Sequence, residues 1–304
     1  MDRSIAIVGA PSSIGIRPYD DGTPRRLDLA PGALRDQGLV ARLGARDDGD
    51  VLPPPYRELV RPPKAIRNAL DVTDYSRALA ERVARAGSAG EFVLVLGGDC
   101  SIVLGSLLGV SGRGRTGLVY LDAHSDFVTA DVSTTGSAAA MCLALAVGRG
   151  EGPLATLRGT QPLVAGRDVV LIGRRDYADE PYYGQDALER FEILDLDHAA
   201  VVSHGPIDAA RLTLERVAQP EIQGFWIHFD ADVLDPSIMP AVDSPEPGGL
   251  GLDQVTDLLS RLARHPKALG LQLTIYDPGL DPGAKGATLL AALLERVLGR
   301  GATT

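Results

Sequence analysis

Short apolar runs recur along the chain, and turn-forming or acidic residues follow each of them. They are too short for most buried helices and too uniformly apolar for a sheet with one face in water. This pattern is typical of parallel strands that are covered on both faces. The six runs are SIAIVGAP (4–11), EFVLVLGGD (91–99), TGLVYLDAH (116–124), DVVLIGRRD (168–176), GFWIHFDAD (224–232) and LGLQLTIYDP (269–278).

Helical patterns lie between these runs, at 73–87 and 253–265, and after the last of them, at 291–300. In the first of them Thr73 is the expected N-cap and Gly87 the expected end. Strands that alternate with helices predict βαβ units, and therefore an α/β fold with a parallel sheet. The proline-rich stretch 51–65 fits a surface excursion better than a domain linker, because the alternation continues on both sides of it. We therefore expect one domain.

Composition narrows the possible partners. Of 304 residues, 45% are hydrophobic, and 40 acidic residues outnumber 30 basic ones, for a net charge of −10. This charge argues against nucleic acid or an anionic membrane as the main partner. Two cysteines do not make a disulfide framework. The start of the chain has no signal-peptide core, and no apolar stretch approaches about 18 residues. We expect a cytoplasmic protein that acts on a small molecule.

Acidic residues gather at three of the predicted strand ends. Asp122, His124 and Asp126 occupy alternate positions, so their side chains project to one side while the chain stays extended. Asp230 and Asp232 repeat the spacing. A third strand ends in Asp99 and Cys100, of which Asp99 is expected to orient the loop.

These strand ends meet at one edge of an open sheet, where ligands bind. Several like charges at that edge repel one another, and a bound cation resolves the repulsion. Four carboxylates, one imidazole and one thiol exceed the needs of a single tetrahedral ion. The set suits two ions bridged by carboxylates with a hydroxide between them, and carboxylate-rich ligation favours Mn²⁺.

Several motifs together resemble the arginase/agmatinase ureohydrolase family. GGDCS (97–101) is similar to the family's G-G-D-H-S, and DAHSD (122–126) to its D-A-H-x-D. FDADVLDPSIMPAVDSPEPGGL (229–250) follows its D-x-D-x-x-D-P pattern with a downstream G-G-L. The small-residue loop near the N-terminus and LIGRRD (171–176) fall in the expected order. The resemblance covers nearly the whole chain.

The resemblance implies one three-layer α/β/α domain over residues 1–304, with a mainly parallel sheet of roughly eight strands. It implies a binuclear Mn²⁺ site whose bridging hydroxide attacks the central carbon of a guanidino-type group and releases urea. Trimers or hexamers are the usual assemblies. By position, one metal takes Cys100, Asp122, Asp126 and Asp230, and the other takes Asp122, His124, Asp230 and Asp232. We assign catalytic roles to His124, Asp126 and Asp230, and substrate contacts to Ser137, Asp243 and Asp277.

The chain departs from the family pattern at three places. Cys100 replaces a histidine ligand, and a softer, charged thiolate admits Zn²⁺, Fe²⁺ or Co²⁺ as alternatives to Mn²⁺. The family's proton-shuttle histidine is absent, and its position falls near Ala139. The guanidinium-binding glutamate is also absent, with Ile275 at about the matching position. Asp243 is a candidate to supply that carboxylate from the opposite wall.

These departures leave alternatives open. A substrate with a more acidic leaving amine, such as an N-hydroxyguanidine or a ureido compound, needs less acid assistance than a plain guanidine. A ureohydrolase-like binding protein with weakened catalysis is the other possibility. Cys100 as a nucleophile is disfavoured, because a cysteine hydrolase needs a histidine partner. Cys142 is expected to be core packing, and His228 is a candidate to support the acidic residues on its own strand.

Overall fold

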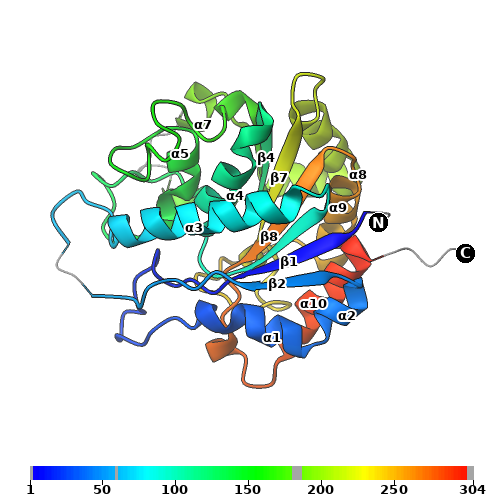
Figure 1. Ribbon diagram of the computed structural model, residues 1–304, viewed down its shortest axis with the longest axis horizontal. Coiled ribbons are helices and arrows are strands. Elements are labelled where there is room, and N and C mark those ends of the chain that lie inside the picture. Colours follow the sequence, from blue (N-terminus) through cyan, green and yellow to red (C-terminus); the bar gives the residue numbers. More distant parts are fainter. Residues whose placement is uncertain (1–2, 59–60, 180–186, 300–304) are drawn as a thin grey trace, which may run out of the picture.

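A single parallel sheet organises the computed structural model, which describes residues 3–58, 61–179 and 187–299 (Figure 1). In this part of the chain eight strands pair in the order β2-β1-β3-β8-β7-β4-β5-β6. Every pairing is parallel. The strands are β1 (Ile5–Ala10), β2 (Arg46–Asp50), β3 (Phe92–Gly97), β4 (Thr116–Leu121), β5 (Val169–Ile172), β6 (Leu194–Leu196), β7 (Gly224–Asp230) and β8 (Ala268–Thr274).

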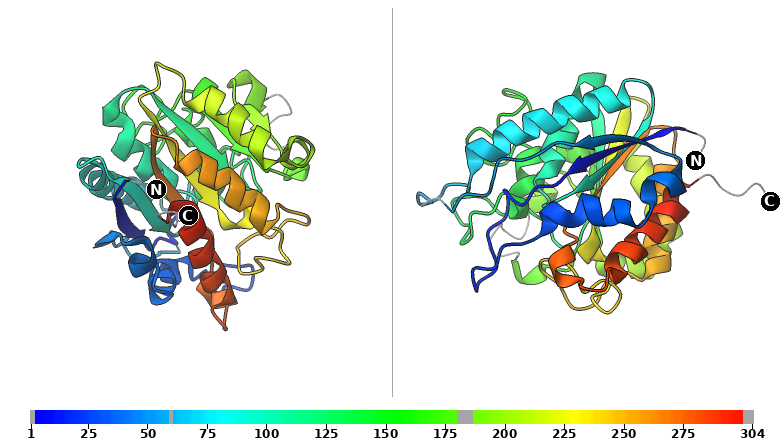
Figure 2. Two further views of the ribbon diagram at one scale, coloured as in Figure 1. Left: turned by 90° about the vertical axis from the view of Figure 1, so that its right-hand side faces the viewer. Right: turned by 60° about the horizontal axis from the view of Figure 1, so that its bottom comes forward.

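Helices cover both faces of the sheet and complete three layers (Figures 1 and 2). On one face α3 and α4 pack against each other, and α5 contacts α4. On the opposite face α8, α9 and α10 lie side by side, with α1 and α2 next to α10. The α-helices are α1 (Ala30–Asp36), α2 (Leu39–Leu43), α3 (Ala69–Gly87), α4 (Ile102–Val110), α5 (Cys142–Ala146), α7 (Ala187–Arg190), α8 (His198–Val217), α9 (Leu252–Ala263) and α10 (Lys285–Leu298).

Each of the six apolar runs contains one strand, and the three predicted helices correspond to α3, α9 and α10. The N-cap prediction at Thr73 is wrong. Helix α3 begins four residues earlier, at Ala69, and the Thr73 hydroxyl donates to the Ala69 carbonyl inside the helix (2.6 Å). Gly87 does end the helix, as expected. The residues of 51–65 that the structure describes form neither helix nor strand.

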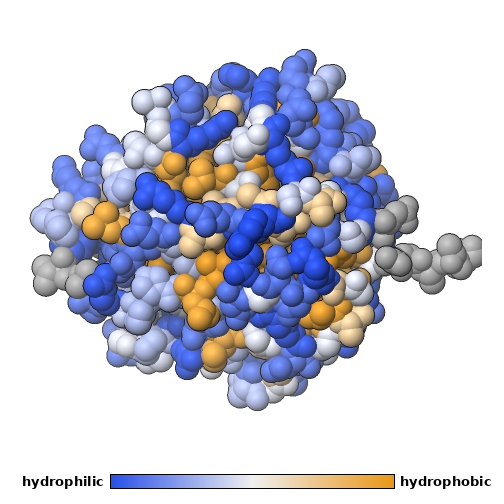
Figure 3. Space-filling model, viewed as in Figure 1, coloured by the Kyte–Doolittle hydropathy of each residue, from blue (hydrophilic) through white to orange (hydrophobic). Residues whose placement is uncertain are grey.

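The sheet supplies the core. Strands β1, β3, β4, β5 and β7 are buried along their whole length, as uniformly apolar strands must be. The outside is mostly hydrophilic, with small apolar groups between, on the face shown in Figure 3. None of the helices in the described part of the chain combines the length and the hydrophobicity that crossing a bilayer requires.

The middle of the sheet positions the candidate site. Strands β3, β8, β7 and β4 are adjacent, and all four end at the same edge. Gly98 lets the loop after β3 pass close to the loop after β1, because a Cβ at this position would lie 2.3 Å from the carbonyl oxygen of Ser12. Asp99 then accepts hydrogen bonds from Ser12, Gly15 and Ser101. Asp99 therefore orients the loop, as the sequence predicts.

Candidate metal centre

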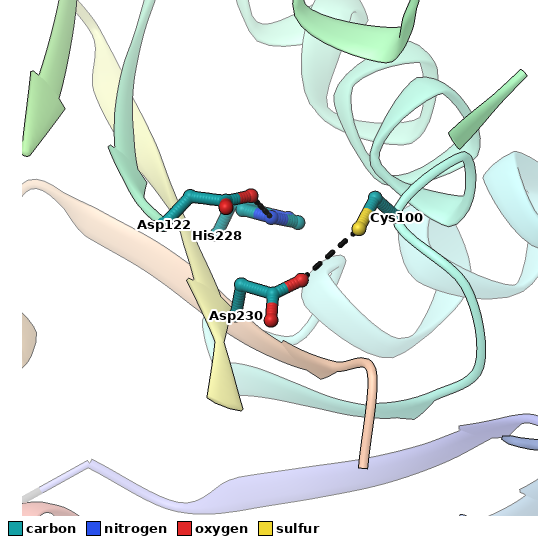
Figure 4. Close-up of side chains that lie close together, drawn as sticks. All are labelled: Cys100, Asp122, His228 and Asp230. Atoms are coloured by element: carbon teal, nitrogen blue, oxygen red, sulfur yellow. Dashed lines mark hydrogen bonds and ion pairs between the residues drawn. The ribbon is translucent and has the colours of Figure 1, made fainter. Parts of the chain in front are cut away.

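Three strand ends bring the first group of potential ligands together (Figure 4). Asp122 follows β4, Asp230 ends β7, and Cys100 follows β3. One ligand atom from each of Cys100, Asp122, His228 and Asp230 lies within 4.8 Å of the others. The Cys100 thiol donates to Asp230 Oδ2 (3.0 Å), and all four side chains are buried.

A second group shares Asp122 with the first. Asp122, His124 and Asp232 also offer ligand atoms within 4.8 Å of one another. His124 Nδ1 lies 2.9 Å from Asp232 Oδ2, and the backbone N–H of His124 donates to Asp122 Oδ1 (2.7 Å). Burial acts to lower the pKa of His124, but the neighbouring charges of Asp232 and Asp122 outweigh it and raise that pKa well above its ordinary value.

Asp126 lies beside these groups rather than in either of them, among the described residues. Its backbone has a φ of 46°, a left-handed conformation that is uncommon for a residue other than glycine. Asp126 Oδ2 accepts hydrogen bonds from the Tyr120 hydroxyl (2.5 Å) and the Cys142 thiol (3.3 Å). The carboxylate is therefore held at the edge of the cluster by two buried donors.

The four carboxyl groups repel one another, and their pKa values show it. Burial raises the pKa of Asp122 to about 7, and the charge of Asp232 adds to the effect. Burial and the charge of Asp122 raise the pKa of Asp126 to about 8. The pKa of Asp230 is raised well above its ordinary value by burial and by Asp232. Burial also acts to raise the pKa of Asp232, but the adjacent His124 lowers it overall.

Cys100 is unsuited to act as a nucleophile. Burial, together with the charges of Asp230 and Asp126, raises the pKa of its thiol well above the ordinary value. A reactive cysteine needs the opposite, a thiolate stabilised by nearby positive charge. The thiol instead donates to a carboxylate that belongs to the same group of potential metal ligands.

One pocket of about 330 Å³ opens onto this cluster. Its wall includes Cys100, Asp122, His124, Asp126 and Asp232, so most of the predicted ligands face one cavity. The remainder of the wall comes from the segments after β1, β4, β5, β7 and β8 and contains, among others, Arg17, Arg25, Ser137, Ala139, Asp176, Asp243, Glu246 and Ile275.

Comparison with known proteins decides the family. A family model described as "Arginase family" matches residues 3–299. The chain belongs to the arginase family. It is 30% identical to an arginase of Brevibacillus brevis, over 98% of this chain and 99% of that protein. It is 28% identical to an arginase of Bacillus subtilis (strain 168), over 99% of each. The native arginase structure from Bacillus caldovelox superposes with a TM-score of 0.87 at 29% identity, and the match covers 98% of this chain and 99% of that one.

Membership of the arginase family confirms two expectations. The eight-stranded parallel sheet between helical layers is the arginase fold. The activity follows as well, since the family and the buried Asp, His and Cys cluster together indicate a metal-dependent hydrolase. Such an enzyme cleaves non-peptide C–N bonds of guanidino compounds and releases urea.

The pocket wall carries the departures from the family pattern. Ala139 and Ile275 both line the cavity, so the positions expected for the shuttle histidine and the substrate-binding glutamate present apolar side chains. Ile275 has a φ of 66°, a strained conformation for a β-branched residue. Its backbone N–H donates to the Gly98 carbonyl (3.0 Å), which ties β8 to the loop that bears Cys100.

The predicted substrate residues differ in their surroundings. Asp243 lines the pocket, but its carboxylate already forms an ion pair with Arg25, whose guanidinium also lies 4.2 Å from the Tyr19 ring centroid. Ser137 also lines the pocket and accepts a hydrogen bond from the Arg17 backbone N–H (3.2 Å).

Asp277 is placed differently from the expectation. It is absent from the pocket wall formed by the described residues and is only 1% exposed. Its carboxylate accepts hydrogen bonds from the Tyr19 hydroxyl (2.9 Å) and from the backbone N–H groups of Arg26 and Gly279. Oδ2 is bonded to the N-terminal loop and Oδ1 to the Gly279 N–H, so this side chain ties the loop after β8 to the N-terminal loop.

Arg175 contributes a clamp that sequence reasoning missed. Its guanidinium donates to the backbone carbonyls of Asp232 (2.8 Å) and Glu246 (3.1 Å) and reaches those of Val233 and Leu234. Glu246 Oε1 lies 3.9 Å from His124 Nε2. The clamp therefore joins the part of the loop after β7 that bears Asp232 to the part that bears Glu246.

Cys142 and His228 both contact acidic residues of the cluster. Cys142 is buried, as expected of core packing, yet it also touches Asp126 and Tyr120 (3.0 Å between Sγ and the hydroxyl). Periodicity alone shows burial and not such a contact. His228 lies 3.3 Å from Asp122 Oδ2 through Nε2, so it does contact an acidic residue of the cluster.

Proposed function

We propose that the chain holds two divalent metal ions, with Mn²⁺ the best fit to a carboxylate-rich site. The observation that carries the proposal is the pair of overlapping ligand groups, joined through Asp122, at the base of one pocket. Cys100, Asp122, Asp126 and Asp230 would hold one ion, and Asp122, His124, Asp230 and Asp232 the other. Asp122 and Asp230 would be shared.

The donor set fits such ions. Buried carboxylates whose pKa values are raised by burial and mutual repulsion gain most from a nearby dication, which replaces their protons. Cys100 is the exception, because its thiol must lose a proton before it ligates. It therefore supports Zn²⁺, Fe²⁺ or Co²⁺ as alternatives in the first site.

The residues of the pocket have separate roles in the proposed reaction. When bound, divalent ions supply Lewis-acid polarisation and an activated water. We propose His124, Asp126 and Asp230 as catalytic residues; with Asp122 and Asp232 they form what we call the acidic floor of the pocket. Besides the hydrogen bonds to Asp122 and Asp126 given above, the Asp232 backbone N–H donates to Asp230 Oδ1 (2.9 Å) and helps to hold this floor in place. Ser137 lines the pocket, and among the described residues its hydroxyl oxygen accepts the Arg17 N–H, which leaves the hydroxyl proton available for a substrate.

The wall of the pocket points to the class of guanidino substrate. Ala139 and Ile275 supply neither a proton donor nor a carboxylate for a plain guanidinium group. We propose that the preferred substrate has a more acidic leaving amine, such as an N-hydroxyguanidine, because its departure needs less acid assistance. Asp243 remains our candidate for the substrate carboxylate, on the condition that the substrate replaces Arg25 as its partner.

A panel of substrates tests this proposal. Guanidino, N-hydroxyguanidino, formimino and amide compounds would be screened for urea, ammonia or amine release by the metal-loaded enzyme. We expect N-hydroxyguanidines to be the faster class. The double variant Ala139→His, Ile275→Glu should shift the ratio of kcat/KM toward plain guanidines. Stoichiometric metal with no turnover on the entire panel would contradict the proposal and favour a binding protein.

Further predictions concern the whole protein. The family's usual assemblies support a homo-oligomer, a trimer or hexamer, which light scattering after gel filtration would measure. The single continuous sheet supports one domain over residues 1–304. Composition supports a cytoplasmic protein that acts on a small molecule, without nucleic acid or membrane as a partner.

A further inference from the structure

A row of polar side chains lies beneath the acidic floor of the pocket. Tyr120, His228 and Gln272 are aligned across β4, β7 and β8, since Tyr120 pairs with His228 and His228 pairs with Gln272. All three are fully buried. Because strand side chains alternate, each shares a face with the residue two positions further on. Those residues are Asp122, Asp230 and Thr274.

A series of hydrogen bonds runs from Trp226 through Gln272 and His228 to Asp122. The Trp226 indole N–H donates to Gln272 Oε1 (3.0 Å), and Gln272 Nε2 lies 2.8 Å from His228 Nδ1. His228 Nε2 lies 3.3 Å from Asp122 Oδ2. An unpaired polar group is costly inside a sheet, so each of these contacts needs one donor and one acceptor.

Because the Trp226 indole N–H can only donate, it determines which group is the donor in each hydrogen bond of this series. An indole nitrogen only donates, so the Gln272 carbonyl oxygen must face it and the amide NH₂ must face His228. An NH₂ group also only donates, so His228 Nδ1 must carry a lone pair. The one proton of the neutral ring is then on Nε2, and it is directed at Asp122.

We propose that Trp226 and Gln272 hold His228 in the Nε2–H tautomer, and that His228 is a positioning residue for the Asp122 carboxylate rather than a metal ligand. The second half of this inference rests on the proposed metal site. The N–H from His228 occupies one lone pair of Oδ2 and fixes the plane of the carboxylate that both ions would share. Outer partners of this kind orient ligands at metal sites in general.

Direct ligation by His228 conflicts with the same contacts. To bind a metal, Nε2 needs its lone pair, and the proton must move to Nδ1, against the Gln272 NH₂. Turning the amide to avoid this would place its NH₂ against the Trp226 N–H. Rotating the imidazole is opposed by Tyr120, whose ring stacks on it at 4.0 Å with an interplanar angle of 13°. Tyr120 is itself tied to Asp126.

The tautomer can be read without any metal. The chain has five histidines, so selective ¹⁵N labelling gives a small set of imidazole signals, and His228→Gln assigns the one of interest. Nitrogen chemical shifts and couplings to ring protons distinguish the two tautomers. We expect the Nε2–H form in metal-free protein, and the same form after loading with diamagnetic Zn²⁺. An Nδ1–H form in metal-free protein, or loss of the Nε2 proton on loading, would overturn the proposal.

Two variants separate the hydrogen-bond chain from ordinary packing. In Gln272→Glu the carboxylate accepts from both Trp226 and His228, so we expect a proton on Nδ1 and a His228 signal that now responds to Zn²⁺. Trp226→Phe removes the group that orients the amide, and we expect both tautomers to appear. Phe225→Leu, a buried change on the same strand, is the control and should leave the Nε2–H form unchanged.

Unchanged tautomers in both Gln272→Glu and Trp226→Phe would contradict the inference, provided that circular dichroism shows folded protein. Failure of the wild type to take up any divalent ion would contradict the proposed metal site alone. The tautomer in the metal-free protein decides the role of Trp226 and Gln272 in either case.

Discussion

In the metal site that we propose, Cys100 should determine how the first group of ligands responds to an ion. A histidine in its place would present a neutral lone pair, whereas the buried thiol must first lose a proton that it holds tightly. For a thiol of ordinary pKa, the need to remove this proton already lowers the apparent metal affinity at pH 7 by about thirtyfold. A raised thiol pKa lowers the affinity further.

We therefore expect Cys100→His to raise the Mn²⁺ affinity at pH 7 by at least about thirtyfold, with a smaller gain for Zn²⁺, which prefers thiolate. Titration calorimetry would measure both ions. Cys142→Ala is the matched control, since Cys142 is the other buried thiol but belongs to neither ligand group in the described residues. Equal effects of the two substitutions would contradict the ligand role of Cys100.

The acidic floor also makes a prediction about pH. The folded pKa values of Asp122, about 7, and Asp126, about 8, exceed the ordinary value of 3.8, so the metal-free folded chain binds more protons than the unfolded chain between these limits. Its stability should fall as pH rises toward 8, by about 1.4 kcal/mol per pH unit for each excess proton.

Chemical denaturation with a chelator present, from pH 5 to 8.5, would measure this slope. Asp126→Asn removes one of the groups and should flatten the curve. With Mn²⁺ the slope should reverse, because deprotonated carboxylates bind the ion better. A metal-free stability that rises with pH over this range, in both proteins, would show that the buried carboxylates are not strained by their neighbours.

At the scale of strands and loops, the sequence predicts the buried strands and the clustering of the residues that follow them. Buried runs must be apolar on both faces, so six strands were visible, and parallel strands bring Asp122, Asp230 and Cys100 to one edge. Strand β2 was missed because it is an exposed edge of charged residues, RDDGD. Strand β6 was missed because it is only three residues long.

Contacts between loops cannot be predicted from apolar runs and strand ends. Arg25 and Asp243 are separated by 218 positions, and neither lies on a regular element that would fix its direction. The row of Tyr120, His228 and Gln272 is partly visible in the sequence. Each of these polar residues interrupts an apolar run two positions before the polar residue at the strand end. Their pairing, however, depends on strand order, which the sequence alone does not give.

The loop between β1 and α1 makes a prediction of its own. Arg25 is an internal guanidinium that already occupies Asp243. Arg25→Met should free this carboxylate and strengthen competitive inhibition by guanidinium ion about tenfold, the value of one charged hydrogen bond. Arg26→Met is the control, because Arg26 is exposed and pairs with Asp28 instead. Inhibition constants that do not change in Arg25→Met would exclude Asp243 as a guanidinium site.

At the scale of the whole molecule, the fold and the acidic net charge both favour a cation site at one edge of the sheet. The arginase fold places its cluster of carboxylates at the carboxyl ends of the central strands, and part of the chain's acidic excess is concentrated there. Buried carboxylates so close together repel one another, and bound protons or cations are needed to offset that repulsion. We therefore attribute part of the net charge of −10 to the proposed metal site.

The number of metal ions bound per chain distinguishes two joined metal sites from a single one. Metal analysis after loading with Mn²⁺ and dialysis should give about two ions per wild-type chain. Asp122→Asn, at the residue common to both groups, should lose both ions, and Asp232→Asn, which belongs to the second group alone, should lose one. A wild type that binds one ion, or an Asp122→Asn variant that keeps both, would contradict the account of two sites joined through Asp122.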